Sequence, residues 1–103
     1  AREIGDRHGE GTALGNLGVA YDKLGETLKA IEFHEQHLAI AREIGDRRGE
    51  GNALFNMALA LDKLGDRESA IANAEAALAI FEAIEDPNRT MVREQLAEWR
   101  SEG

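Results

Sequence analysis

The chain repeats itself with a period of 40 residues, and this period limits the folds that it can adopt. Residues 6–24 read DRHGEGTALGNLGVAYDKL, and residues 46–64 read DRRGEGNALFNMALALDKL. The similarity continues in KAIEFHEQHLAI at 29–40 and SAIANAEAALAI at 69–80. A fixed period of this length indicates supersecondary units that stack side by side, because each unit buries its apolar face against the next one.

Each unit is predicted to be a pair of helices. Apolar residues recur at helical rather than alternating spacing, helix-forming residues are plentiful, and aromatic residues make up only 5% of the chain. The single proline, Pro87, lies near the end and interrupts nothing before it. Turns of two or three residues force successive helices to be antiparallel. We therefore predict an all-α superhelix of two antiparallel hairpins and a closing helix, with helices at 8–24, 27–44, 48–64, 67–84 and 87–100.

Glycine followed by aspartate marks the predicted turns. Gly5 and Gly45 are each expected to end a helix in the left-handed conformation, with Asp6 and Asp46 capping the next helix. The chain is accordingly interpreted as part of a longer array. Its predicted units are the tail of a preceding helix (1–4), a first repeat (5–44), a second repeat (45–84) and a closing helix (85–103) with an apolar face of Val92, Leu96 and Trp99.

We interpret the differences in residue volume between the two copies as compensating. The inward face of the second helix of each hairpin carries bulk at different heights: Ala30, His34, His37, Ala41 and Ile44 in the first copy, and Ala70, Ala74, Ala77, Phe81 and Ile84 in the second. On the first helix, Gly15 and Gly18 stand where the second copy has Phe55 and Ala58. Because a core is filled to near-crystalline density, these differences predict matched large and small neighbours.

The net charge of −8 argues against two classes of partner. Nucleic acids and anionic membrane surfaces both require clustered Lys and Arg. No apolar run approaches the roughly 20 residues of a membrane span, and no signal peptide opens the chain. There is no cysteine, hence no disulfide and no thiolate metal site. We expect a cytoplasmic protein with a protein or peptide partner.

No set of residues in the sequence indicates catalysis. A nucleophile beside a base, a phosphate-binding loop and a carboxylate pair are all missing from the pattern. His34 and His37 are three residues apart, so HEQH is not the HExxH zinc motif, and no third ligand can be predicted. We interpret both histidines as helix-packing residues and expect no enzyme, cofactor or metal. The alternative, a metal-dependent enzyme, requires a third ligand near these histidines.

The spacing Leu14-x-x-Leu17-Gly18-x-x-Tyr21, followed by Ala30, resembles the tetratricopeptide repeat. The second copy has Leu54, Met57, Ala58, Leu61 and Ala70 at the same places. The usual repeat has about 34 residues. The longer period and the phrase AIEFHEQHLAIAREIGDR resemble the Pins/LGN-type subgroup and, more distantly, kinesin light chain. VREQLAEWR at 92–100 is similar to the closing helix of repeat arrays in bacterial multidomain signalling proteins.

This resemblance implies a concave, peptide-binding surface lined by the first helix of each hairpin. Asn16 and Asn56 would grip a peptide backbone, since an amide offers both a donor and an acceptor. Carried over by position, the lining is Thr12, Gly15, Asn16, Val19, Asp22 and Lys23 in the first copy, and Asn52, Phe55, Asn56, Leu59, Asp62 and Lys63 in the second.

The first functional hypothesis is therefore an interaction scaffold that binds an extended or partly helical segment of a partner. The second is a structural spacer in a larger signalling protein, because near-identical repeats stack without any ligand. In that case the apolar edge formed by Ile4, Leu14 and Leu17 is expected to be partly exposed and to cause self-association. A designed or consensus repeat protein would show the same regularity.

Overall fold

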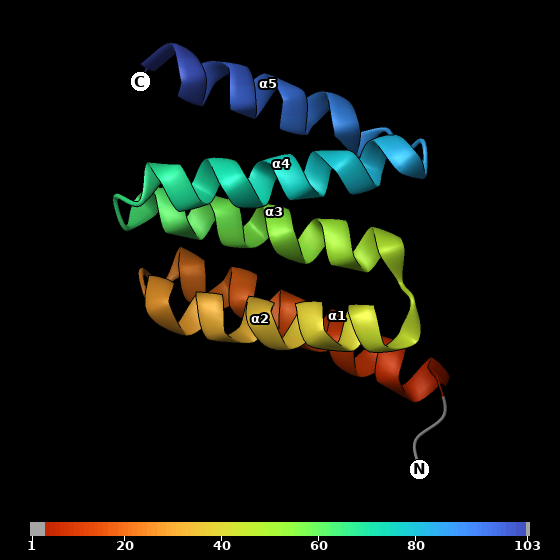
Figure 1. Cartoon of the computed structure of the whole chain (residues 1–103). Coiled ribbons are helices and arrows are strands. Elements are labelled where there is room, and N and C mark those ends of the chain that lie inside the picture. The colour runs from red at the N-terminus through yellow and green to blue at the C-terminus, as the bar shows by residue number, and fades with distance from the viewer. Residues whose placement is uncertain (1–3, 103) are drawn as a thin grey trace.

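The computed structural model describes residues 4–102, which form five α-helices and contain no strand. The helices are α1 (Ile4–Lys23), α2 (Thr27–Ile44), α3 (Arg47–Lys63), α4 (Arg67–Ala83) and α5 (Asn88–Glu102). Each packs against its neighbour in the chain, so that the hairpins follow one another from the N-terminal to the C-terminal end of the molecule (Figure 1). The predicted all-α fold of two hairpins and a closing helix is confirmed.

The turns between helices have the predicted chemistry. Gly25, Gly45 and Gly65 have φ angles of 83°, 74° and 86°, a region that glycine enters without steric cost. The carboxylate of Asp46 accepts a hydrogen bond from the amide of Gly49 at 3.0 Å and so caps α3. Asp66 caps α4 in the same way from Ser69, at 3.1 Å. The chain therefore reverses direction every 20 residues.

The turn predicted at Gly5 and Asp6 is wrong. Both residues lie inside α1, which begins at Ile4 rather than near His8, and Gly5 does not have a positive φ. At Gly45 the left-handed turn is held by hydrogen bonds to the carbonyl of Ala41 from the amides of residues 45 and 46. Glycine adopts either sign of φ, so without such bonds it continues a helix. The rest of the predicted preceding tail, residues 1–3, lies outside the described residues.

The largest apolar core joins the second hairpin to the closing helix. Val92, Leu96 and Trp99 are 0%, 1% and 3% exposed, which confirms the predicted face of α5. The guanidinium of Arg67 lies over the Trp99 ring, 5.6 Å from its centre, and donates to the Trp99 carbonyl at 3.3 Å. The remaining core residues are Leu54, Phe55, Met57, Ala58, Ala70, Ala74, Ala77, Ile80 and Phe81.

The first hairpin is packed around its histidines. His34 and His37 are 2% and 8% exposed. A methyl group on Gly18 would lie 2.5 Å from the Cε1 atom of His34, and one on Gly15 would lie 2.7 Å from the Nδ1 atom of His37. The glycines thus make room for the imidazole rings, as the prediction of matched volumes requires. In the second hairpin, Gly51 makes room for Phe81.

The outer face of α1 is left uncovered within the described part of the chain. Leu17 is 44% exposed, and Leu14 is half-buried, as expected for an apolar edge. The side chain of Ile4, the third residue of the predicted edge, lies outside the described part. Ile84 is 38% exposed rather than inward-facing, because α4 ends at Ala83 and Ile84 already belongs to the turn.

Candidate functional site

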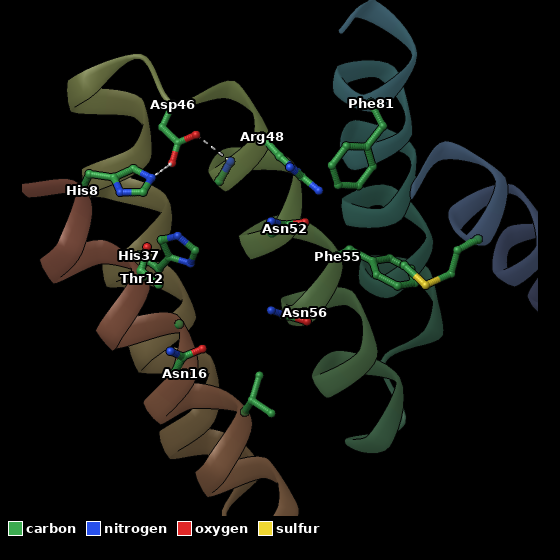
Figure 2. A pocket seen from close by; sticks show the side chains of 14 residues that line it. His8, Thr12, Asn16, His37, Asp46, Arg48, Asn52, Phe55, Asn56 and Phe81 are labelled. Atoms are coloured by element: carbon green, nitrogen blue, oxygen red, sulfur yellow. Dashed lines mark hydrogen bonds and ion pairs between the residues drawn. The ribbon is translucent and has the colours of Figure 1, made fainter. Parts of the chain in front are cut away.

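A cavity of about 400 Å³ lies between α1 and α3 and reaches past α3 toward α5. We call it the α1–α3 groove. Its walls come from the first helix of each hairpin, and His37 of α2 contributes to its lining (Figure 2). The lining residues are His8, Thr12, Gly15, Asn16, Val19, His37, Asp46, Arg48, Gly49, Asn52, Phe55, Asn56, Phe81 and Met91.

Two short ladders of polar side chains face the groove. Thr12 and Asn16 stand one helical turn apart on α1, and Asn52 and Asn56 repeat this arrangement on α3 (Figure 2). All four were predicted to line the concave surface, as were Val19 and Phe55, and the structure brings them together. Within residues 4–102, none of the four polar side chains forms a hydrogen bond. Their donors and acceptors are therefore available to a ligand.

Charged residues close one end of the groove. The Nε2 atom of His8 lies 3.5 Å from the carboxylate of Asp46 (Figure 2). The guanidinium of Arg48 lies 3.1 Å from the carboxylate of Asp86. Arg48 and Asp86 stand 40 residues after His8 and Asp46, so the second pair repeats the position of the first. Prediction from the sequence missed His8 and Arg48. The signal was present, because each precedes a predicted lining residue, Thr12 or Asn52, by one helical turn.

His37 lines the groove with a largely buried ring. Its Nδ1 atom is buried without a hydrogen-bond partner in the described part of the chain. Burial lowers the pKa of His37, Asp46 opposes this effect, and His8 adds to it. The ring is therefore neutral at neutral pH. Because a buried acceptor without a partner is tolerated better than a buried N–H, we assign the proton to Nε2.

The groove becomes apolar on the far side of α3. Phe55 points from α3 toward α5 (Figure 2). Met91 of α5, which is 49% exposed, also lines the cavity. Phe81 of α4 completes this half and is 1% exposed. Only the tertiary packing of α4 and α5 brings Phe81 and Met91 to the site. The groove thus offers hydrogen bonds at one side and apolar surface at the other.

Five of the predicted lining residues lie outside the cavity. The ammonium of Lys63 binds the Asp22 carboxylate at 2.5 Å, and Arg67 binds Asp62 at 2.6 Å. Lys23 is exposed at the end of α1. Leu59 packs against the core cluster that includes residues of α5. These five residues therefore lie outside the cavity, and their part in binding a ligand stays a prediction.

Two classes of site receive no support from the geometry. In the described part of the chain, no group of three or more His, Asp or Glu side chains is placed to hold a metal ion. His34 and His37 are buried packing residues, as predicted. None of the helices between residues 4 and 102 is both long and apolar enough to span a bilayer.

Stacked antiparallel helical hairpins with a groove between their first helices define a helical-repeat protein of the solenoid class. Comparison with protein families matches residues 9–83 to the tetratricopeptide repeat. Because this match covers most of the chain, the protein belongs to the tetratricopeptide repeat family. Repeats of this family are generally protein–protein interaction modules and are typically not enzymes. Comparison with curated proteins gives no match. Assignment to the Pins/LGN-like or kinesin light chain-like subgroup stays a prediction.

Proposed function

We propose that this protein binds an extended segment of a partner protein in the α1–α3 groove, mainly through the peptide backbone of that segment. The observation that carries the proposal is the set of unbonded polar side chains on both walls, above all Asn16 and Asn56. An asparagine amide can donate to a carbonyl and accept from an N–H of the same peptide chain. Recognition of this kind tolerates many ligand sequences.

The spacing of the asparagines supports an extended ligand. Asn52 and Asn56 are four residues apart on α3, which corresponds to ~6 Å along a helix with a rise of 1.5 Å per residue. Two residues of an extended chain span ~6.6 Å. Successive amides on α3 can therefore meet peptide units two residues apart, while Thr12 and Asn16 face the ligand from the opposite wall.

The charge of the groove supports a ligand of low net charge. The chain carries a net charge of −8. In the groove, however, one acidic residue, Asp46, and one basic residue, Arg48, contribute opposite formal charges to the lining. The surface near Phe55 and Met91 would accept an apolar side chain next to the backbone-binding half. A strongly acidic segment would gain nothing here and would be repelled by the rest of the molecule.

The proposal is tested with peptides selected from a random phage-displayed library on the intact chain. The best peptide is then titrated calorimetrically into the wild type and the double variant Asn16→Ala/Asn56→Ala. We expect the double variant to lose about tenfold to a hundredfold in affinity, since each net hydrogen bond contributes ~0.5–1.5 kcal/mol. N-methylation of the peptide backbone at the contacting residues should cause a comparable loss.

Asn73→Ala is the matched control, because Asn73 is a half-buried asparagine of α4 that lies outside the groove. It should bind like the wild type. Equal affinity of the groove variant and the wild type would refute the asparagine mechanism. Failure to select any peptide would favour the alternative function of a structural spacer.

A further inference from the structure

One polar side chain of the α1–α3 groove comes from the second helix of its hairpin. His37 belongs to α2, yet it lines the cavity together with residues of α1 and α3 (Figure 2). Its ring packs against α1 where two glycines, Gly11 and Gly15, stand one helical turn apart. A methyl group on Gly11 would lie 3.3 Å from Cδ2 of the ring, and one on Gly15 would lie 3.1 Å from Cε1. The ring therefore occupies space that side chains of α1 would otherwise fill.

The second hairpin has a different residue pair at the equivalent place. Phe55 stands in the position of Gly15, and Ala77 stands in the position of His37. Ala77 is fully buried and does not line the cavity, whereas Phe55 does. At this height the groove thus receives an imidazole ring in the first hairpin and a phenyl ring in the second. The polar ring is a property of the first repeat alone.

The two nitrogen atoms of the His37 ring have different surroundings. Nδ1 is buried and has no hydrogen-bond partner within residues 4–102. Nε2 is bonded to Cδ2 and Cε1, the atoms that pack against Gly11 and Gly15, so it lies at the tip of the ring beside α1. It also forms no hydrogen bond in the described part of the chain. Because the ring lines the cavity while Nδ1 is buried, the Nε2–H group is the polar part that reaches the groove.

We propose that the Nε2–H group of His37 donates a hydrogen bond to a neutral oxygen atom of the bound segment and so adds specificity to the α1–α3 groove. This inference rests on the proposed function, because the acceptor belongs to the peptide that is bound there. The proton stays on Nε2, since moving it to Nδ1 would bury an N–H group without a partner. A segment without an acceptor at this point leaves the Nε2–H group unpaired in the complex, which lowers the affinity.

The charges around the ring favour a neutral acceptor. The carboxylate of Asp46, 3.5 Å from the Nε2 atom of His8, lines the same cavity, and its charge acts on the His37 ring. Arg48 is already paired with Asp86. A ligand carboxylate would be repelled by Asp46 and by the net charge of −8, and Lys or Arg side chains offer only donors. The acceptor is therefore a peptide carbonyl or the oxygen of an Asn, Gln, Ser or Thr side chain.

Calorimetry with a peptide selected on the intact chain tests the contact. We expect His37→Leu to lose about twofold to tenfold in affinity, which is the contribution of one net hydrogen bond. His37→Gln should recover most of this loss, because its amide nitrogen also donates. Circular dichroism checks that the variants keep their helical content.

His34→Leu is the matched control. His34 is 2% exposed, packs against Gly18 of α1 and has a buried Nδ1 atom without a partner in the described part of the chain, but it does not line the groove. The substitution disturbs the same kind of packing and should leave the affinity unchanged.

Nitrogen-15 NMR of the imidazole rings gives a readout that a packing role would not change. The free protein should carry the His37 proton on Nε2, and the peptide should shift the Nε2 and Hε2 resonances of His37 but not those of His34. Variant peptides identify the acceptor. If it is a side chain, one alanine substitution abolishes both the shift and the effect of His37→Leu. If it is a peptide carbonyl, only a thioamide, which is a weaker acceptor, does so.

The outcomes separate this inference from the proposed function. A proton on Nδ1 of His37 would overturn the inference. So would equal affinity of His37→Leu and the wild type for a peptide that Asn16→Ala/Asn56→Ala binds more weakly, and the proposed function would then stand. A loss in His37→Leu but not in the asparagine variant would support the contact and refute the asparagine mechanism. Selection of no peptide would overturn both proposals.

Discussion

Glu85 occupies a backbone conformation that the other turns reserve for glycine. Its φ is 56°, and it is the non-glycine residue with positive φ in the described part of the chain. It follows Gly25, Gly45 and Gly65 at the same interval of 20 residues, directly before the aspartate that precedes the next helix. The fold therefore requires the left-handed conformation at this turn, although a residue with a Cβ atom adopts it only at a cost in free energy.

We predict that Glu85→Gly stabilises the protein by ~0.5–1 kcal/mol. Removing the Cβ relieves the ~1–2 kcal/mol cost of the left-handed conformation, and the greater freedom of glycine in the unfolded chain offsets part of that gain. Urea denaturation measures the change. Gly65→Ala is the opposite substitution at the equivalent turn and should destabilise the protein by a similar amount. A destabilised Glu85→Gly variant would show that the side chain makes a contribution that the turn geometry does not reveal.

At the scale of elements, the two hairpins solve one packing problem in two ways. In the first, Gly18 of α1 leaves room for His34 of α2. In the second, Ala58 and Ala74 stand at the equivalent positions, and both are fully buried. Compared with the first hairpin, the second has a larger residue on its first helix and a smaller residue on its second helix, while both hairpins keep the same arrangement of helices. Neither residue of such a pair can be exchanged alone.

We therefore predict strong coupling between these two positions. Gly18→Ala should destabilise the protein by ~1–3 kcal/mol, because its Cβ would lie 2.5 Å from the buried imidazole. His34→Ala should also destabilise it by leaving a cavity. The double variant recreates the alanine pair of the second hairpin and should recover most of both losses. A double-mutant cycle by urea denaturation measures the coupling, and additive losses would contradict the prediction.

At the scale of the whole molecule, the buried histidines make stability depend on pH. Burial lowers the pKa of both His34 and His37, with His37 and His8 respectively adding to the effect. Their native pKa values thus lie below the ordinary value of 6.5, so the unfolded chain takes up protons first as the pH falls. The stabilisation that the neutral rings contribute is therefore fully present above about pH 6.5. It decreases as the pH falls below 6.5, and it stops decreasing once the pH is below the native pKa.

We expect the midpoint of thermal unfolding to fall as the pH is lowered from 7 toward 5. This loss of stability occurs at a higher pH than the loss that is due to the carboxyl groups. Hydrogen bonds from Ser69 and Arg7 lower the pKa of Asp66 and Glu43 below their ordinary values of 3.8 and 4.5, so their contribution is lost only in more acidic solution. The Gly18→Ala/His34→Ala variant should show a smaller decline between pH 7 and 5. An equal decline in both proteins would exclude His34 as the source.

The sequence by itself determined the helices, the hairpins and most of the polar ladder. These features depend on residues close together in the chain or exactly one period apart: the glycine–aspartate turns, the apolar spacing, and Asn16 with Asn56. The turn at Gly5 was predicted wrongly because local sequence does not say whether the hydrogen bonds that hold a left-handed glycine are present. Repetition transfers a local conformation only when its neighbours are also repeated.

Only the tertiary structure decided what each repeated position contacts. Val19 lines the groove, whereas its equivalent Leu59 lies outside the cavity and packs against the apolar core formed by α3, α4 and α5. Packing also brought Phe81 and Met91 to the groove from α4 and α5. Burial is a property of the assembled chain, since the same side chain gains or loses neighbours according to which helix lies beside it.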